Sequence, residues 1–193
     1  MENNWEQYVE NTKESNVRPL LREAMEFVKE RNEALDLGSG AMNDVRYLVS
    51  QDFEHITAVD TAPIAKDILS TFPSEKVEYV ISNFEHFDFK ENKYDLINAQ
   101  YSLPFNPASS FPDVWNKTIS SLKIEGVITG NFFGEKDEWN NNDRDMNFHS
   151  LDQVKELLST LKVIKLEERE RDEATASGII KHWHIINFIA RKI

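Results

Sequence analysis

The sequence predicts a single α/β domain built on a mostly parallel β-sheet that helices cover on both faces. Two observations carry this prediction: short apolar runs alternate with amphipathic segments from residue 33 to residue 161, and the last two apolar runs follow each other without a helix between them. A third observation is a turn with two glycines, "LDLGSG", directly after the first apolar run. We therefore expect seven strands, with one antiparallel strand at the end of the sheet.

The composition indicates a globular protein that folds around one core. The chain has 193 residues, of which 40% are hydrophobic, and it contains no repeat or linker-like segment. No run approaches the roughly 18 apolar residues of a membrane-spanning helix, and the polar N-terminus lacks the features of a signal peptide. Because the chain has no cysteine, disulfides and thiolate chemistry are excluded, and we expect a cytoplasmic protein.

The net charge of −12 argues against nucleic acid and anionic membranes as partners, because these surfaces attract clustered Lys and Arg. The nearest basic segments are the short "KHWH" and "ARKI" near the C-terminus. Acidity that mostly serves solubility is an equally good interpretation, and neither one names a substrate.

Each expected element follows from a local pattern. Pro19 suits the first turn of a helix, and Ser150 is a good N-cap for another. Residues 172–178 are short and turn-like, so the last two strands should form a hairpin, and the mixed charges of "KLEERERDEA" suit a solvated edge. The expected strands are 33–37, 55–60, 76–82, 94–100, 126–133, 162–171 and 181–190. The expected helices are 3–13, 17–32, 43–51, 62–72, 110–123 and 151–161.

The glycine turn lies in "ALDLGSGAMNDVRYL", residues 34–48. Gly38 and Gly40 can take positive φ and let a ligand lie against bare backbone, and the following helix begins near Asn43 with free N–H groups. A dinucleotide site would need a third glycine where Asn43 stands, and Asp36 would repel a pyrophosphate. The same carboxylate suits a ligand that carries a positive charge.

This segment, followed by "ITAVD" at residues 56–60, resembles the first two motifs of class I S-adenosylmethionine-dependent methyltransferases. Asp36, Gly38 and Gly40 match the first motif, and Met42 stands where its third glycine would be. The resemblance implies a Rossmann-like class I methyltransferase fold and the cofactor S-adenosyl-L-methionine, which carries an ammonium and a sulfonium group. The compact size, "YSLPF" at residues 101–105 and the terminal "ARK" are similar to the small tellurite-resistance and thiopurine methyltransferases.

The resemblance also implies which residues hold the cofactor. Asp60 would accept hydrogen bonds from the ribose hydroxyls, with a helix N-cap as the competing role. Asn83 and Phe84 would contact the adenine, although an acid is more usual at position 83. The segment 98–102, from Asn98 to Ser102, would line the methionine end. The full expected set is Asp36, Gly38, Ser39, Gly40, Asp60, Thr61, Asn83, Phe84, Gln100 and Tyr101.

Two regions are candidates for the acceptor site. "WEQYVE" could fold over the cofactor as a lid, and the polar segment 132–150 follows a strand at the functional edge of the sheet. The first region contributes Trp5, and the second contributes Arg144. The expected acceptor contacts are Tyr8, Trp139, His149 and His182.

The histidines also raise the question of a metal site. "KHWH" places His182 and His184 on one strand face and Trp183 on the other. Zinc needs three or four ligands that converge on one point. His149 would be the third histidine, and spacing in the sequence alone does not show that the three converge. Surface or strand histidines are the better interpretation, so we expect no metal, and Trp183 is more typical of a core residue.

These inferences divide the chain into a lid segment (1–32), a cofactor-binding core (33–132), a substrate-side loop (133–150) and a C-terminal helix and hairpin (151–193). The expected activity is methyl transfer to an unidentified small molecule. No catalytic residue is assigned, because in-line transfer needs a general base only if the acceptor must lose a proton. A non-catalytic cofactor-binding module and a nicotinamide-dependent oxidoreductase stay as alternatives, and the oligomeric state is open.

Overall fold

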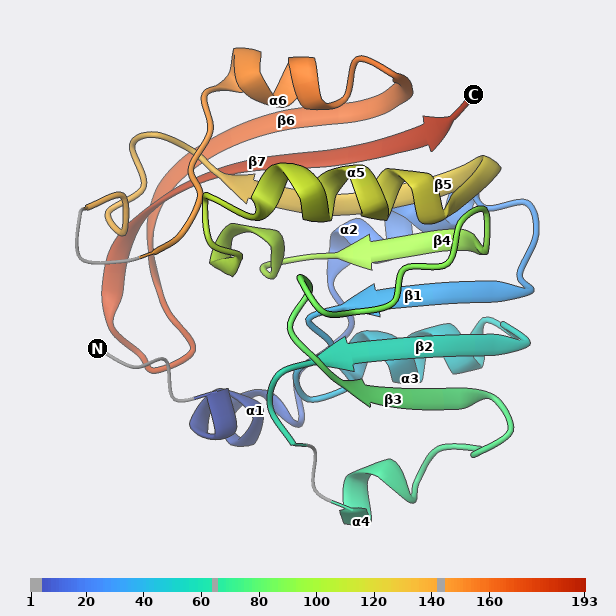
Figure 1. The fold of residues 1–193 in the computed structure, drawn as a ribbon. Coiled ribbons are helices and arrows are strands. Elements are labelled where there is room, and N and C mark those ends of the chain that lie inside the picture. The colour runs from blue at the N-terminus through green and yellow to red at the C-terminus, as the bar shows by residue number, and fades with distance from the viewer. Residues whose placement is uncertain (1–4, 64–65, 142–144) are drawn as a thin grey trace.

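The computed structural model describes residues 5–63, 66–141 and 145–193. It contains a seven-stranded sheet in the order β3-β2-β1-β4-β5-β7-β6, with helices packed on both faces (Figure 1). The strands are β1 (Glu33–Leu37), β2 (His55–Asp60), β3 (Val77–Ile81), β4 (Tyr94–Ala99), β5 (Leu122–Phe133), β6 (Leu161–Ala174) and β7 (Ile180–Lys192). The predicted α/β fold is confirmed.

The first five strands are parallel, and the sheet turns antiparallel only where β7 enters it. β7 lies between β5 and β6, so the antiparallel strand is one position in from the edge, whereas the prediction placed it at the end of the sheet. β6 forms the edge itself, and its charged residues are mostly exposed, which agrees with the prediction of a solvated edge strand.

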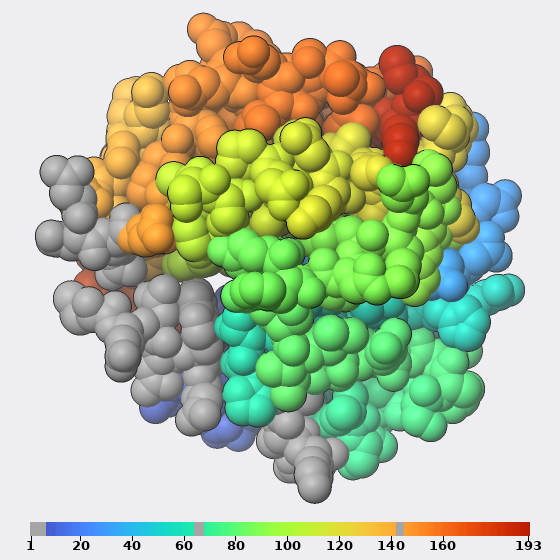
Figure 2. Space-filling view, in the orientation of Figure 1, coloured from blue at the N-terminus to red at the C-terminus, as the bar shows by residue number. Residues whose placement is uncertain are grey.

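Two layers of helices bury the two faces of the sheet. On one face, α5 (Phe111–Ser121) and α6 (Leu151–Leu157) cover a core that includes Trp115, Phe132 and Phe188. Figure 2 shows α5 and the segment before it closing over the middle of this face. On the other face, α2 (Pro19–Ala24) and α3 (Asn43–Ser50) cover a second core around Leu21 and Leu48.

Several element boundaries differ from the prediction. The predicted helix 17–32 is α2 followed by a single 3₁₀ turn, η1 (Met25–Phe27), because Val28 takes an extended conformation that leads the chain into β1. The predicted helix 62–72 shrinks to α4 (Lys66–Leu69), since turns at Thr71 and Phe72 precede Pro73. The remaining elements are α1 (Trp5–Thr12) and the 3₁₀ turn η2 (Leu103–Phe105).

The strands at the C-terminal side are longer than predicted. β5 begins at Leu122, directly after α5, because Leu122 already pairs with Tyr94 of β4. The β6–β7 hairpin pairs from Leu161 with Lys192 as far as Ala174 with Ile180. In Figure 1 this hairpin curves past the carboxyl ends of the parallel strands toward α1. The Asn11 side chain of α1 donates to the Ala176 carbonyl at 3.3 Å, so these two segments are in contact.

Candidate functional site

The glycine turn joins β1 to α3 at the carboxyl end of the sheet. Gly38 and Gly40 both adopt positive φ, at 79° and 48°, as predicted for a tight turn. The Gly38 N–H donates to the Val59 carbonyl at 2.8 Å and the Ser39 N–H to the same oxygen at 3.1 Å. A Cβ on Gly38 would lie 2.3 Å from the Cβ of Ser102, so the position accepts no larger residue without movement. The turn is therefore held against β2 and against the segment after β4.

Two buried carboxylates lie directly beneath this turn. The Asn98 Nδ2 donates to Asp36 Oδ1 at 2.7 Å and to Asp44 Oδ2 at 3.1 Å, while Gln100 Nε2 donates to Asn98 Oδ1 at 2.8 Å. Asp36 is only 2% exposed, and its Oδ2 has no hydrogen-bond partner among the described residues. A buried acceptor without a donor is costly, so this oxygen is a candidate ligand contact.

The environment of Asp36 disfavours its charge when no cation is present. Burial and then the carboxylate of Asp44 raise the pKa of Asp36 to about 8, against the opposing effects of the Asn98 hydrogen bond and the Arg18 charge. A cationic group placed next to Oδ2 would favour the ionised form. The site is therefore suited to a ligand with a positive charge, as the sequence predicted from Asp36.

Arg18 brings the N-terminal segment into this cluster. Its backbone N–H donates to Asp44 Oδ1 at 3.0 Å, and its Nη2 donates to the Tyr8 hydroxyl at 3.1 Å. Its guanidinium lies 5.0 Å from the ring centroid of Tyr101. Arg18 and Asp44 were not predicted from the sequence. An acid directly after the glycine turn was a usable signal for Asp44, whereas Arg18 is 26 residues away from its partner.

Tyr8 lies over the turn itself. Its Cε1 is 3.4 Å from the position that a Cβ on Gly40 would take. The side chain of Asn43, the first residue of α3, donates to the Thr12 carbonyl at the end of α1 at 2.7 Å. α1 is thus attached to the glycine turn on one side and to the β6–β7 hairpin on the other.

Asp60 ends β2 beside the turn. Its Oδ2 accepts from the Gly40 N–H at 2.8 Å and its Oδ1 from the Ala62 N–H at 2.9 Å. The bond to Ala62 closes a turn directly after β2, and the described residues of α4 begin at Lys66. A carboxylate oxygen accepts more than one hydrogen bond, so both oxygens can still receive ligand hydroxyls. Thr61 follows as an exposed residue.

The side chains expected to contact the adenine already have partners within the protein. Asn83 is exposed, and its Oδ1 already accepts from the His86 N–H at 3.1 Å within a turn. Phe84 packs partly buried against the core under α5. Of this pair, the backbone of Phe84 is the better placed group, since the side-chain oxygen of Asn83 is shared with the turn.

The segment after β4 joins the charged cluster to an aromatic one. Tyr101 adopts a φ of 54°, and its N–H donates to Asn131 Oδ1 at 2.7 Å. Positive φ is unfavourable for a bulky residue, so the surroundings hold Tyr101 in place. The Oγ of the adjacent Ser102 is buried and has no hydrogen-bond partner among the described residues.

The aromatic cluster comprises Tyr101, Phe105, Phe133, Trp139 and Trp183. The ring centroids of Tyr101 and Trp183 are 6.1 Å apart, and those of Trp139 and Trp183 are 5.2 Å apart. All but Phe133 are partly exposed. The structure thus brings the predicted acceptor residue Trp139 together with Tyr101, while Trp183 is a wall of this surface as well as a packing residue.

The predicted histidines lie on the other face of the sheet. The His149 ring packs on Phe111 and Phe132, which belong to the core under α5, and burial lowers its pKa. His182 is a surface residue whose Nδ1 lies 2.8 Å from Asp172 Oδ1, and this hydrogen bond raises its pKa. Both are therefore separated from Tyr101 and Trp183.

The remaining expectations concern metal ligands and residues outside the described part. His182 and His184 do share a strand face, and His184 accepts from the Lys136 N–H through Nδ1 at 3.1 Å. No group of metal-ligating side chains occurs among the described residues. The side chain of Trp5 and the whole of Arg144 lie outside the residues that the structure describes.

Comparisons with known proteins agree with the fold. A family described as "Methyltransferase domain" matches residues 35–128, which run from β1 to β5 and include the glycine turn and Asp60. A search of curated protein sequences finds no significant match.

Solved structures share the fold over most of the chain. One is the 1,6-didemethyltoxoflavin-N1-methyltransferase of Burkholderia thailandensis with bound 1,6-didemethyltoxoflavin and S-adenosylhomocysteine, at a TM-score of 0.74 and 21% identity, covering 94% of this chain and 80% of the other. TehB from Haemophilus influenzae has a TM-score of 0.79 at 14% identity, over 96% of this chain, which spans 66% of TehB. A SAM-dependent methyltransferase from Methanosarcina mazei has a TM-score of 0.66 at 16% identity, covering 92% of this chain and 99% of the other.

Proposed function

We propose that this chain, a class I S-adenosylmethionine-dependent methyltransferase, transfers the methyl group of its cofactor to a small-molecule acceptor. The observation that carries the proposal is the junction at Tyr101. There, a buried charged cluster, with oxygens that lack hydrogen-bond partners among the described residues, adjoins a partly exposed aromatic surface. No helix in the described part of the chain is long and apolar enough to cross a membrane.

The residues around the glycine turn fit S-adenosylmethionine in shape and charge. The oxygens of Asp36 and Ser102 that lack partners among the described residues would accept from the ammonium group, and Arg18 would attract the carboxylate. Asp60 would accept from the ribose hydroxyls, while Gly38 and Gly40 leave the backbone open to the nucleoside. The other proposed contacts are Ser39, Thr61, Asn83, Phe84, Gln100 and Tyr101.

When bound, S-adenosylmethionine supplies a methyl carbon that the sulfonium already activates. The residues of the chain then have to align the acceptor and keep water away. Tyr101 is suited to the alignment because its unusual backbone conformation and the Arg18 stack fix its ring between the two clusters. A general base is needed only for an acceptor that loses a proton.

A small-molecule acceptor is supported by a structural neighbour and by the charge of the chain. The Burkholderia thailandensis enzyme, which shares the fold, has the small molecule 1,6-didemethyltoxoflavin bound. The net charge of −12 disfavours nucleic acid at this site. Trp139 is the predicted acceptor residue that lies next to Tyr101 and Trp183, so we retain it, whereas His149 and His182 face away.

We expected the whole segment 1–32 to form a lid, but α2 packs in the core, so α1 is the part that would act as a lid over the amino-acid end of the cofactor. Tyr8 lies on the glycine turn and contacts Arg18, so movement of α1 would uncover the turn and release the Arg18 side chain. The hydrogen bond of α1 to Asn43 is part-buried and the one to Ala176 is exposed, which suits a segment that opens and closes.

The test is calorimetric titration of S-adenosylhomocysteine into the purified chain and into the variant Asp60→Ala. We expect Asp60→Ala to weaken binding at least about a hundredfold, since it removes charge-assisted hydrogen bonds to the ribose and to Gly40. Asp113→Ala, which removes an exposed carboxylate paired with Lys117 on α5, is the matched control and should bind as the wild type does. Equal affinity of wild type and Asp60→Ala would refute the assigned site.

Catalysis is tested separately by following the consumption of S-adenosylmethionine with a panel of small aromatic molecules. Turnover with at least one compound supports the proposal. Tight cofactor binding with no turnover over the whole panel would favour a non-catalytic binding module.

A further inference from the structure

Two arginines of the edge strand β6 lie on the face of the hairpin that carries Trp183. In the register of β6 with β7, Arg171 is opposite Trp183 and Arg169 is opposite Ile185. Residues opposite each other in an antiparallel pair project from the same face of the sheet. Trp183 and Ile185 both pack in the cluster that contains Tyr101. The two arginines therefore border the acceptor surface, by which we mean the partly exposed rings of Tyr101 and Trp183.

The charges of these arginines act on Tyr101. Burial raises the pKa of the Tyr101 hydroxyl, while the positive charges of Arg18, Arg171 and Arg169 oppose this rise and the negative charge of Glu173 adds to it. Water and salt screen charges that are far apart. The three arginines therefore lie near Tyr101, as the strand register also indicates for the two on β6.

Arg169 differs from the other two arginines because no carboxylate is paired with it. Arg171 Nη2 lies 2.5 Å from Glu173 Oε2, and Arg18 Nε lies 3.7 Å from Asp44 Oδ2. Arg169 is exposed and forms no ion pair or hydrogen bond with the described residues. Its guanidinium is therefore available to a ligand at the acceptor surface.

The acids next to Arg169 on β6 do not cancel its charge at this surface. Glu167 shares the face of Arg169, and its Oε2 lies 3.7 Å from Lys165 Nζ. Glu168 and Glu170 project from the opposite face, because side chains alternate along a strand. A ligand at the acceptor surface would therefore meet Arg169 rather than a carboxylate of these residues.

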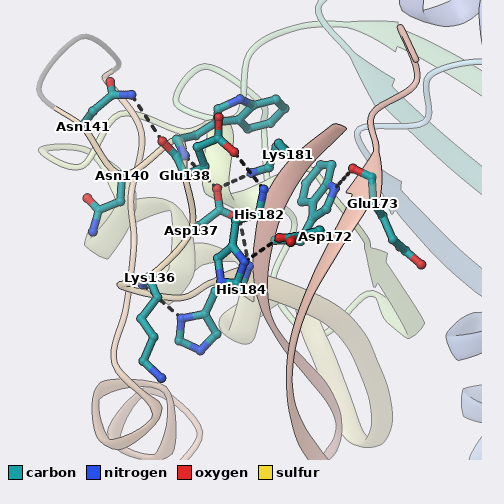
Figure 3. Close-up of polar contacts among 12 residues, drawn as sticks. Lys136, Asp137, Glu138, Asn140, Asn141, Asp172, Glu173, Lys181, His182 and His184 are labelled. Atoms are coloured by element: carbon teal, nitrogen blue, oxygen red, sulfur yellow. Dashed lines mark hydrogen bonds and ion pairs between the residues drawn. The ribbon is translucent and has the colours of Figure 1, made fainter. Parts of the chain in front are cut away.

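The lysine on the paired strand adds no net charge to the same face. Lys181 of β7 is 2% exposed and donates to Asp137, whose side chain is fully buried. Figure 3 shows Asp137 and Lys181 pointing toward each other, while the side chain of Glu173, opposite Lys181 in the register, points away from them. Since this buried pair is neutral as a whole, the unbalanced positive charge of the hairpin face comes from Arg169.

A buried amide beside Tyr101 supplies a further donor. Asn131 of β5 is 1% exposed, and its Oδ1 accepts from the Tyr101 N–H at 2.7 Å. Its buried Nδ2 has no hydrogen-bond partner among the described residues. A buried donor without an acceptor is costly. Asn131 therefore also favours a ligand that brings lone pairs to this region.

These donors suit an acceptor that carries a negative charge. A guanidinium is always charged, and its planar array of N–H groups matches the two oxygens of a carboxylate. The chain as a whole has a net charge of −12, so an anionic ligand needs a local positive charge in order to bind. The rings of Tyr101 and Trp183 would contact the planar part of the same ligand.

We propose that Arg169 is a specificity-determining residue, which makes the acceptor surface select aromatic acceptors that carry a negatively charged oxygen group such as a carboxylate. This inference rests on the proposed function, since it takes Tyr101 and Trp183 as the acceptor side of a methyltransferase. Arg169 binds the charged group of the acceptor and takes no part in the transfer of the methyl group.

The experiment compares two probes with the same bicyclic frame, quinoline-3-carboxylate and quinoline-3-carboxamide. Each is titrated by calorimetry into protein saturated with S-adenosylhomocysteine at pH 8, where the carboxylate is ionised. We expect the wild type to bind the carboxylate about fivefold more tightly than the amide, because the ion pair is strong in geometry but partly screened by water. A ratio below about twofold, or no binding of either probe, would overturn the inference.

Variants test whether Arg169 is the cause. Arg169→Met removes the charge and keeps an unbranched side chain, so the two probes should bind equally, whereas Arg169→Lys should keep a preference for the carboxylate. Lys162→Met is the matched control, because it removes a positive charge from an exposed position at the other end of β6, where Lys162 pairs with Arg191. It should keep the wild-type ratio. An unchanged ratio in Arg169→Met, or the same loss in Lys162→Met, would overturn the inference.

The same titrations separate this inference from the proposed function. If S-adenosylhomocysteine fails to bind the wild type, the proposed function is wrong. If it binds and the probes are not discriminated, only the role of Arg169 is wrong. Unchanged affinity of Arg169→Met for S-adenosylhomocysteine would show that the substitution leaves the cofactor site folded.

Discussion

Asp36 and Asp44 share one side-chain donor, since Asn98 Nδ2 lies 2.7 Å from Asp36 Oδ1 and 3.1 Å from Asp44 Oδ2. Two carboxylates held on one neutral amide repel each other, and Arg18 neutralises only part of that charge at 3.7 Å from Asp44. In the free protein this repulsion disfavours the ionised form of Asp36, and a cationic ligand would offset the repulsion. Several properties that can be measured depend on this relationship.

Cofactor affinity should depend on pH through Asp36. Because its pKa is raised to about 8 in the free protein, lowering the pH from 8 to 6 protonates the group that has to face the ammonium. We expect the affinity for S-adenosylmethionine to fall by up to about tenfold per pH unit over this window. Calorimetry in buffers of different ionisation enthalpy should also detect proton release on binding. Affinity that is constant between pH 6 and 8 would contradict this account.

The same group should affect the stability of the free protein in the opposite direction from ordinary carboxylates. Its pKa is near ~3.9 when unfolded and about 8 when folded. Its favourable contribution is complete below pH ~4 and is lost as the pH rises through 8. Asp36→Asn should therefore raise the thermal midpoint of the free protein at pH 8.5 more than at pH 5, while it weakens cofactor binding. An equal change at both pH values would argue against a raised pKa.

Gly38→Ala and Gly178→Ala form a matched pair of substitutions. Both glycines have φ near 80°, at 79° and 82°, but a Cβ on Gly178 meets nothing within 4 Å, while one on Gly38 meets Ser102 at 2.3 Å. Gly178→Ala should cost about 1–2 kcal/mol from backbone strain alone. Gly38→Ala should cost more and should also abolish S-adenosylhomocysteine binding. Chemical denaturation and calorimetry measure both, and similar results for the two variants would remove the special role of Gly38.

Arg18→Met should remove the side-chain contacts that join α1 to the charged cluster. Arg18 contacts Tyr8, Asp44 and Tyr101, so its loss should weaken S-adenosylhomocysteine binding about tenfold or more, or ~1.4 kcal/mol. Arg22→Met is the control, since Arg22 lies in the helix that follows and stacks over Tyr47 at 5.7 Å. Equal affinities of the two variants would contradict a role for Arg18 in cofactor binding.

The fold and the geometry of the glycine turn could be predicted because their signals are local in sequence. Apolar runs and turn residues determine the order of strands and helices, and the "DLGSG" pattern places an acid and two glycines within five positions. Asp60 could be predicted as well, because it ends the strand that pairs with β1. Element boundaries were less predictable. Val28 is extended where the helical pattern continues, and at Leu122 the pairing with Tyr94 overrides that pattern.

The proposed acceptor side could not be predicted to the same degree because its contacts span long stretches of sequence. Lys181 and Asp137 are 44 residues apart, and "KHWH" drew attention to its histidines rather than to the lysine. The alternation of strand residues placed Trp183 opposite His182, but only the pairing of β7 with β5 shows which face meets Tyr101. The structure thus separates His149 and His182 from Tyr101 and Trp183, while the acceptor contacts themselves stay a prediction.

The central claim is tested most directly by a crystal structure of the chain with S-adenosylhomocysteine. The account predicts that the ribose hydroxyls lie on Asp60, that the ammonium group lies within hydrogen-bond distance of Asp36 Oδ2, and that the sulfur faces Tyr101 and the aromatic cluster. A nucleoside bound away from residues 36–40, or a sulfur that points away from Tyr101, would contradict it.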